Sequence, residues 1–281
     1  MAKKYWSQRK GLTAKYDFSS LTIAIKSVFY DFGNRDYFQE YYGYDCVDAG
    51  RVNGKAGIDI PNFIFRKIRR QIKWPLEFDT FDEDTLFDII ELLHDTISFP
   101  LEGYFHEYAG CGYHYSSFDT LKGQDEYRKE INEIIADYES GYILNLEGII
   151  QHLLTPGLNE LTMARIPSEI GEKDKIDNKI DWAIAKYRDR HSTLLDRKEA
   201  IRELADVLEF LKSTLKDNMT TDDEKELLKI QKDLFNIANN FQIRHNNDSQ
   251  KDDYSQSWMS WIFYLYLSSI HLLLRIRRKG I

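Results

Sequence analysis

Cysteine is scarce in this sequence, with 2 among 281 residues, Cys46 and Cys111. Two thiols are too few for a disulfide-stabilised scaffold of the kind that small secreted domains use. The first ten residues, MAKKYWSQRK, also lack the apolar core of a secretory signal. We therefore expect a protein of the reducing cytoplasm.

An excess of positive charge is missing as well. The chain has 38 Lys and Arg against 46 Asp and Glu, a net charge of −8. Proteins that coat DNA or RNA without specificity depend on many cations that neutralise phosphates, so this class is disfavoured, although a local basic site is compatible with the composition. No GxxxxGK, GxGxxG, HExxH or GxSxG pattern occurs, which removes the common signatures of nucleotide-binding proteins and hydrolases.

One long apolar run is present, WMSWIFYLYLSSIHLLL at Trp258–Leu274, followed by the basic RIRRKGI. Its length is close to that of a membrane span, and basic residues after it fit a tail anchor with the positive side inside. The run is slightly short, however, and it includes or adjoins several polar residues, Ser257, Ser260, Ser268, Ser269 and His271. We favour the buried central helix of a soluble bundle and keep the membrane anchor as the alternative.

The N-terminal part, residues 1–165, is rich in aromatic residues and predicts a helical domain with a small β wing. Apolar spacing predicts helices over 19–32, 61–74, 82–98 and 124–138, with Pro61 in a first turn and Pro75 at an end. The glycine-punctuated residues 41–57 are typical of turns or a small hairpin, and 101–123 of a long loop. GYILNLEGII predicts two short strands around a turn.

A boundary is expected near 156–180, and residues 172–281 predict a second, all-helical domain. Ala200–Leu215 places its leucines and isoleucines on one stripe. Thr221 with Glu224 forms a capping box that opens the next helix. With the helix before them and the Trp258 helix, these segments predict a four-helix bundle. The fold class expected for the whole chain is mainly α.

The stretch FQIRHNND, residues 241–248, contains the pair Arg244 and His245 among several asparagines, Asn239, Asn240, Asn246 and Asn247. Asparagine is unfavourable inside a helix, so this density suggests a site. Arginine can hold a phosphate with two hydrogen bonds, and histidine can transfer protons near neutral pH. Together they could cleave RNA without a metal, through attack of a 2′-hydroxyl on phosphorus. The alternative is that both cations simply cap the C-terminus of a helix.

The segment from about Trp182 to the C-terminus resembles the C-terminal helical region of bacterial abortive-infection proteins. The likeness is carried by RDRHSTLLDRKEAIRELADVLEFLK, DLFNIANNFQIRHNNDSQ and WMSWIFYLYLSSIHLLLRI. This region is similar to the HEPN superfamily of four-helix, usually dimeric proteins. Upstream, YWSQRKGL resembles the "FS-x-R-x-G" opening of AbiJ-like proteins, and LFDIIELLHDTIS resembles their central helix.

The resemblance implies an antiphage effector, a metal-independent HEPN-type ribonuclease that works as a homodimer on RNA and needs no cofactor. In such enzymes an Arg, often followed by Asn, Asp or His, precedes a His by four to six residues, and two motifs meet across the dimer. Here Arg244 and His245 match the front of the pattern, but Asp248, Ser249 and Gln250 occupy the closing positions.

The residues expected at this catalytic site are Arg244, His245, Gln250 and Asn240, with support from Asp206, Glu209, Asn239 and Asn246. The amide of Gln250 can position a phosphate but cannot exchange a proton. The alternative function is therefore a catalytically silent sensor module of a defence system that binds RNA or a partner protein. For Asp206 and Glu209 the alternative is an ordinary solvated helix face.

A second group of reactive residues lies in FHEYAGCGYHYSSFD. His106, Cys111 and His114 are all able to bind zinc, and Cys46 is the distant thiol that could complete a tetrahedron. Three ligands do not close a structural site, and the sequence has no CxxC pair. The pattern favours a packed, tyrosine-rich loop that contacts a partner, and no metal is predicted.

The most basic segment outside the tail is RKIRRQIK, which contains Arg66, Arg69, Arg70 and Lys73. At helical spacing these cations share a face that could contact RNA phosphates. The alternative is a solvated face beside an inward apolar one, formed by Phe63, Ile64, Ile68 and Ile72.

Overall fold

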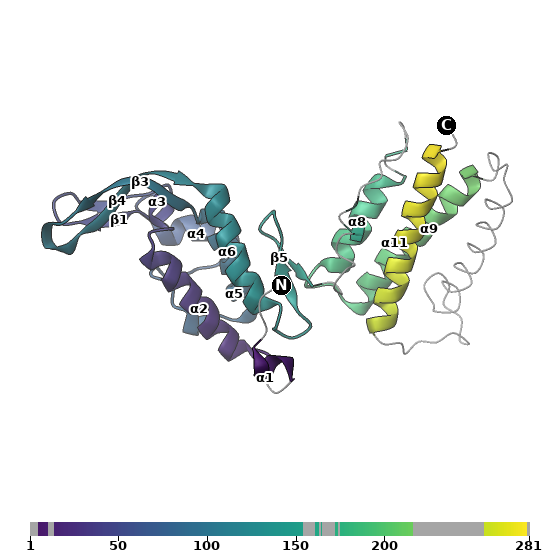
Figure 1. Ribbon diagram of the computed structural model, residues 1–281, viewed down its shortest axis with the longest axis horizontal. Helices are drawn as coiled ribbons and strands as arrows, with labels where there is room; N and C mark the ends of the chain where they lie inside the picture. The colour runs from purple at the N-terminus through teal and green to yellow at the C-terminus, as the bar shows by residue number, and fades with distance from the viewer. Residues whose placement is uncertain are drawn as a thin grey trace. The chain divides into compact units, whose positions relative to one another are not determined.

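The computed structural model describes residues 5–10, 14–153, 161–162, 164, 172–173, 175–215 and 256–279. The chain divides into two compact units, Met1–Leu153 and Leu154–Ile281, called unit 1 and unit 2 below (Figure 1). Helices dominate the described residues, together with three two-stranded antiparallel hairpins. The expected mainly helical class is thus confirmed, with more strand than the small wing that the sequence predicts.

Unit 1 contains most of the elements. Its helices are α1 (Trp6–Arg9), α2 (Phe18–Asn34), α3 (Gln39–Tyr42), α4 (Ile60–Ile68), α5 (Glu83–Thr96) and α6 (Thr120–Ile135), with two short 3-10 turns, η1 (Phe78–Thr80) and η2 (Tyr108–Gly110). Its strands pair in chain order: β1 (Tyr44–Cys46) with β2 (Gly50–Val52), β3 (Phe99–His106) with β4 (Gly112–Asp119), and β5 (Tyr142–Leu144) with β6 (Ile150–His152).

Aspartate residues start the main helices of unit 1. In each case the carboxylate accepts a hydrogen bond from the backbone N–H three residues further on, which satisfies one of the free donors of a first turn. The distances are 2.8 Å for Asp17 at α2, 3.0 Å for Asp59 at α4, 2.8 Å for Asp82 at α5 and 3.0 Å for Asp119 at α6. Local sequence therefore fixes where these helices begin.

Tyr127 of α6 lies at the centre of the apolar core that joins α2, α5 and α6. It is fully buried, its ring centroid lies 5.7 Å from that of Phe32 in α2, and its hydroxyl donates to the Ile90 carbonyl of α5 at 3.2 Å. The apolar spacing that predicts a helix over 82–98 also predicts one inward face, and all of its members are buried: Leu86, Ile89, Ile90, Leu93 and Ile97.

Residues 101–123 do not form the predicted loop. They form most of β3 and β4, joined by a tight tip, and then the start of α6 (Figure 1). The glycines that suggest a loop have other reasons. Gly110 and Gly112 have positive φ angles of 71° and 95° in the tip, and a Cβ on the strand residue Gly103 would lie 2.5 Å from the His114 carbonyl oxygen and 2.9 Å from Tyr115. The hairpins expected at 41–57 and at 141–150 are confirmed as β1–β2 and β5–β6.

The predicted helix over 61–74 is too long. α4 ends at Ile68, and Arg69 adopts the left-handed conformation with φ 58° while its N–H bonds to the Phe65 carbonyl at 2.8 Å. Arg70 then turns toward α5, where its Nε donates to the Asp88 carboxylate at 2.8 Å. The helix therefore ends at the left-handed Arg69 rather than just before Pro75, so Arg69, Arg70 and Lys73 do not continue a helix face with Arg66.

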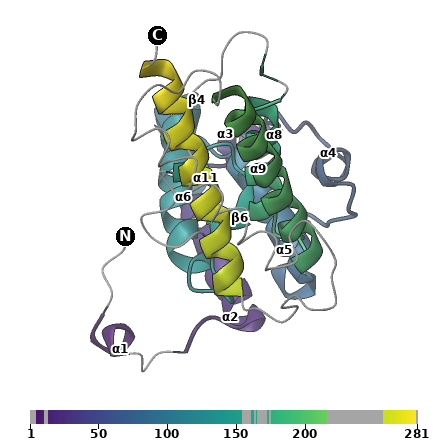
Figure 2. The ribbon, with the colours of Figure 1, turned by 90° about the vertical axis from the view of Figure 1, so that its right-hand side faces the viewer.

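The described part of unit 2 consists of α8 (Asp177–Arg188), α9 (Leu194–Leu215) and α11 (Gln256–Lys279), shown together in Figure 2. The α9 stripe is buried as predicted at Ile201, Leu204, Ala205, Leu208 and Leu211. The Tyr187 ring of α8 stacks on Phe263 of α11 with centroids 4.0 Å apart, and its hydroxyl lies 3.1 Å from the Ser260 hydroxyl. The helix predicted to begin at Thr221 lies outside the described residues.

α11 is the one helix, among the residues described, whose length and composition would allow it to cross a membrane, over Ser257–Arg275. More than half of this segment, 56%, is buried within the protein. Its inward side carries Met259, Ile262, Phe263, Tyr266, Leu267, Ile270, Leu273 and Leu274. Such burial is expected if the run is a core helix, which the sequence favours over a membrane anchor.

Candidate metal centre

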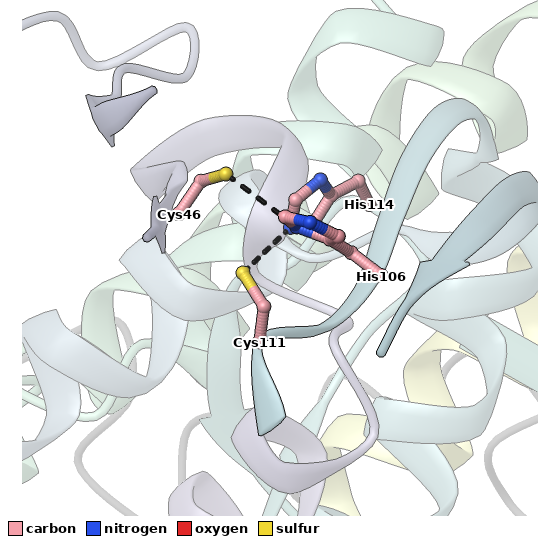
Figure 3. Close-up of side chains that lie close together, drawn as sticks. All are labelled: Cys46, His106, Cys111 and His114. Atoms are coloured by element: carbon pink, nitrogen blue, oxygen red, sulfur yellow. Dashed lines mark hydrogen bonds between the residues drawn. The ribbon is translucent and has the colours of Figure 1, made fainter. Parts of the chain in front are cut away.

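Four side chains able to bind a metal converge in unit 1. They are Cys46, His106, Cys111 and His114, and one ligand atom from each lies within 4.8 Å of all the others. Figure 3 shows both sulfurs and both imidazoles directed toward a common centre. Cys46 ends β1, while the other three lie at and around the tip of the β3–β4 hairpin.

The turn between β1 and β2 affects the ionisation of the Cys46 thiol. Hydrogen bonds from the backbone N–H groups of Ala49 and Asp48 to the sulfur lower the pKa of the Cys46 thiol below its ordinary value. Because the thiolate is the form of cysteine that binds metals, this turn favours the binding form.

The hairpin tip presents Cys111 through an unusual backbone. Ala109, Gly110 and Gly112 all have positive φ, at 52°, 71° and 95°. A Cβ on either glycine would meet nothing within 4 Å, so the conformation rather than lack of space calls for glycine there. This tight turn brings the Cys111 sulfur to 3.6 Å from the Asp45 carbonyl oxygen of β1, beside Cys46.

The two histidines come from neighbouring strands and share one face of the hairpin. His106 pairs with Gly112 and His114 pairs with Tyr104 in the antiparallel register, and directly paired residues point to the same side. The imidazole centroids lie 5.3 Å apart. The His106 Nδ1 atom lies 3.7 Å from the Cys46 sulfur, and the His114 Nε2 atom lies 3.1 Å from the Cys111 sulfur.

Each imidazole is held from behind by an oxygen atom. The His106 Nε2 lies 3.2 Å from a carboxylate oxygen of Asp48, and the His114 Nδ1 lies 2.9 Å from the Tyr104 hydroxyl. His114 also stacks on the Tyr44 ring with centroids 4.3 Å apart. Metal-binding histidines almost always use their second nitrogen in this way, which fixes the tautomer and leaves a lone pair for the metal.

The spacing fits a tetrahedral ion. Bonds of about 2.3 Å to sulfur and about 2.0 Å to nitrogen place tetrahedral ligand atoms roughly 3.3–3.8 Å from one another. The two sulfur–nitrogen distances, 3.7 and 3.1 Å, lie close to this range, and no pair of ligand atoms is farther apart than 4.8 Å. Cys46 and His114 are buried, and the His106 side chain is 20% exposed. Four protein ligands in a largely closed site are typical of structural zinc, since catalytic zinc keeps one position open.

The sequence identifies all four residues as possible zinc ligands, but it does not predict that they lie close together. The decisive contact is between the β1–β2 turn and the hairpin tip, which are about 60 residues apart, as the Cys46–His106 pair illustrates. Three of the four ligands come from residues 101–123, which the sequence predicts to be a loop. The pairing of these residues as strands β3 and β4 brings the three ligands together. The fourth ligand, Cys46, is a single cysteine in a glycine-rich turn, and such a cysteine is weak evidence for a metal site by itself.

The basic residues predicted to contact RNA lie on and beyond α4. Arg66 and Arg69 are exposed. Arg70 lies 2.8 to 4.0 Å from three α5 carboxylates, and Lys73 lies 3.1 Å from Glu77. Arg70 and Lys73 also line a surface pocket of about 460 Å³. Acidic neighbours therefore neutralise two of the four cations.

The residues predicted for ribonuclease chemistry lie mostly in the part of the chain that the structure does not describe: Asn239, Asn240, Arg244, His245, Asn246 and Gln250. Their roles stay predictions. Asp206 and Glu209 lie on α9, where Asp206 is half-buried and Glu209 is exposed.

No protein-family model, no curated protein and no solved structure matches this chain.

Proposed function

We propose that unit 1 is a zinc-binding module in which one Zn²⁺ is held by Cys46, His106, Cys111 and His114. The observation that carries the proposal is the convergence of four ligand atoms within 4.8 Å, with both imidazoles held by oxygen atoms at their far nitrogens. Thiolate and imidazole are the ligands that zinc prefers in proteins.

The role of the ion in this proposal is structural. The β1–β2 hairpin has only three residues in each strand, too few for a hairpin to be stable by itself. Zinc ties this hairpin to the tip of the longer β3–β4 hairpin, and its binding free energy adds to the stability of the fold.

The test is the metal content of the purified full-length protein, measured by mass spectrometry after growth with zinc. We expect about one zinc per chain, and loss of the metal in Cys111→Ser and in His114→Gln. His191→Gln is the matched control, since His191 is an exposed histidine of unit 2. Substitution by Co²⁺ should give the strong visible bands of tetrahedral thiolate coordination. A metal-free protein, or a weak octahedral cobalt spectrum, would contradict the proposal.

For the whole chain we propose an abortive-infection effector that acts on RNA through unit 2 as a homodimer. Support comes from the resemblance of residues 182–281 to the HEPN region and from the Arg244–His245 pair. The helical packing of α8, α9 and α11 is compatible with it. The alternative is a sensor of the same class that binds RNA or a partner protein without cutting, because Gln250 stands where the closing histidine is expected.

The two alternatives differ in their products. The full-length protein is incubated with RNA without added metal, and the RNA is run on a denaturing gel. Cleavage that Arg244→Ala abolishes and Arg275→Ala preserves supports the ribonuclease, since Arg275 is an exposed arginine of α11. Binding without new bands supports the sensor. Intact RNA with no binding rejects the ribonuclease and the RNA-binding form of the sensor, and leaves a sensor that binds a partner protein.

A further inference from the structure

The two sulfur ligands of the candidate metal centre, Cys46 and Cys111, are the only cysteines of the chain. Their sulfur atoms lie within 4.8 Å of each other. A disulfide bond is about 2.05 Å long, so the sulfurs need to approach by less than about 3 Å to form one. Because the sequence has no third thiol, an intramolecular disulfide has a single possible pairing.

The two sulfurs differ in their access to solvent. Cys46 is 8% exposed at the end of β1, whereas Cys111 is partly exposed at the hairpin tip. Figure 3 shows the two sulfurs next to each other on one side of the imidazoles, so an oxidant that reaches Cys111 finds the second thiol close by. An accessible cysteine beside a second one is typical of redox-sensing sites.

The hairpin tip that carries Cys111 has space in which to move. Gly110 and Gly112 flank this cysteine, and a Cβ on either glycine would meet nothing within 4 Å. The Cys111 sulfur already lies 3.6 Å from the carbonyl oxygen of Asp45, the residue before Cys46. A small shift of the tip therefore brings the Cys111 sulfur to the Cys46 sulfur.

Formation of this disulfide removes both sulfur ligands from the metal centre at once. The thiolate is the form of cysteine that binds metals, and a disulfide sulfur is no longer a thiolate. His106 and His114 then remain as two of the four ligands, which is too few for a structural zinc site. Loss of the ion is thus a direct consequence of the oxidation.

We propose that Cys46 and Cys111 form an oxidation-sensitive switch, in which a hydroperoxide converts their two thiolates into a disulfide and releases the zinc ion. The inference rests on the zinc site proposed above and adds how that site is regulated. The disulfide joins β1 to the hairpin tip, the same two elements that zinc joins, while both imidazoles are released from the metal.

The reaction has two steps. The Cys111 thiolate attacks one oxygen of hydrogen peroxide, so that an S–O bond forms, the O–O bond breaks and hydroxide leaves. The Cys46 thiolate then attacks the sulfur of this sulfenic acid, so that the S–S bond forms, the S–O bond breaks and a second hydroxide leaves. The two sulfurs together lose two electrons, which the peroxide takes up, and Zn²⁺ leaves without a change of charge. A thiol reductant reverses the oxidation by thiol–disulfide exchange.

The test treats the full-length, zinc-loaded protein with hydrogen peroxide in the presence of a coloured zinc chelator. We expect one zinc ion to be released for each disulfide formed, and mass spectrometry after proteolysis to find the peptide that links Cys46 to Cys111. Dithiothreitol with added zinc should restore both thiols and the metal. The same protein with chelator and without peroxide is the control, and it should release zinc much more slowly.

These measurements use the wild-type chain, so they do not depend on whether a cysteine variant folds. Cys46→Ser and Cys111→Ser each leave one thiol, and neither should give an intramolecular link. The zinc content before peroxide is added separates the two proposals. A protein without zinc contradicts the zinc site and the switch together. A zinc-loaded protein that keeps its metal in peroxide, forms links between chains, or loses zinc with both thiols still reduced contradicts the switch alone.

Discussion

Asp48 holds the imidazole of His106, one of the four candidate metal ligands, in its orientation. Its carboxylate lies 3.2 Å from the Nε2 of His106, and its backbone N–H helps lower the pKa of the Cys46 thiol. Asp48→Ala removes the carboxylate and leaves the backbone bond. We expect zinc affinity to fall about 10- to 100-fold, the usual effect of losing such a partner.

Competition with a coloured zinc chelator measures this change. Asp45→Ala is the control, because the Asp45 carboxylate lies in the same hairpin but pairs with Arg51 at 3.2 Å. If both variants lose affinity equally, Asp48 has no orienting role and the loss reflects the hairpin as a whole.

At the scale of elements, the start of α5 depends on its N-cap residue, Asp82. The Asp82 carboxylate accepts the Thr85 N–H at 2.8 Å, and hydrogen bonds from the side chain and backbone of Thr85 lower the pKa of Asp82 below its ordinary value of 3.8. We expect Asp82→Ala to lower the free energy of unfolding by about 1 kcal/mol at neutral pH. Urea unfolding followed by circular dichroism measures it, with Glu133→Ala on the exposed face of α6 as control.

The pH dependence of this difference has a definite sign. Because the folded-state pKa of Asp82 is depressed, its stabilisation is complete above the unfolded-state value and is lost as pH falls through the folded-state value. The gap between wild type and Asp82→Ala should therefore narrow below about pH 4. A gap that stays constant to lower pH would show that the charged carboxylate is not what caps the helix.

A comparison of α5 with α4, β3 and β4 shows which features of an element the local sequence pattern can predict. α5 is amphipathic, has an aspartate just before its first residue and a proline four residues after its last, and the structure confirms its inward face and, to within two residues, both of its limits. α4 was predicted six residues too long, because no glycine or proline marks its end: Arg69 adopts the left-handed conformation, and Arg70 pairs with Asp88 of α5. β3 and β4 were missed because glycines needed for a tip and for close ring packing look like loop residues.

For the whole molecule, the two units should respond differently to a chelator. The candidate ligands all lie in unit 1, whereas unit 2 is held together in its described part by apolar packing of α8, α9 and α11. Removal of zinc should therefore speed amide hydrogen exchange in β1, β3 and β4 and leave α9 unchanged. Exchange followed by mass spectrometry on the intact protein, with and without chelator, measures this. Equal acceleration in α9 would mean that the metal stabilises both units or binds elsewhere.

The sequence by itself determined the helix-rich class, the starts of α2, α4 and α5 to within one residue, and the inward faces of α5 and α9, whereas α6 begins four residues before its predicted start. These features depend on residues within a few turns of one another, so local spacing is enough to specify them. Tertiary structure alone decided the end of α4, the pairing of β3 with β4, and the meeting of Cys46 with His106, Cys111 and His114. Each of these requires groups far apart in the chain to come within bonding distance, and no local pattern encodes that distance.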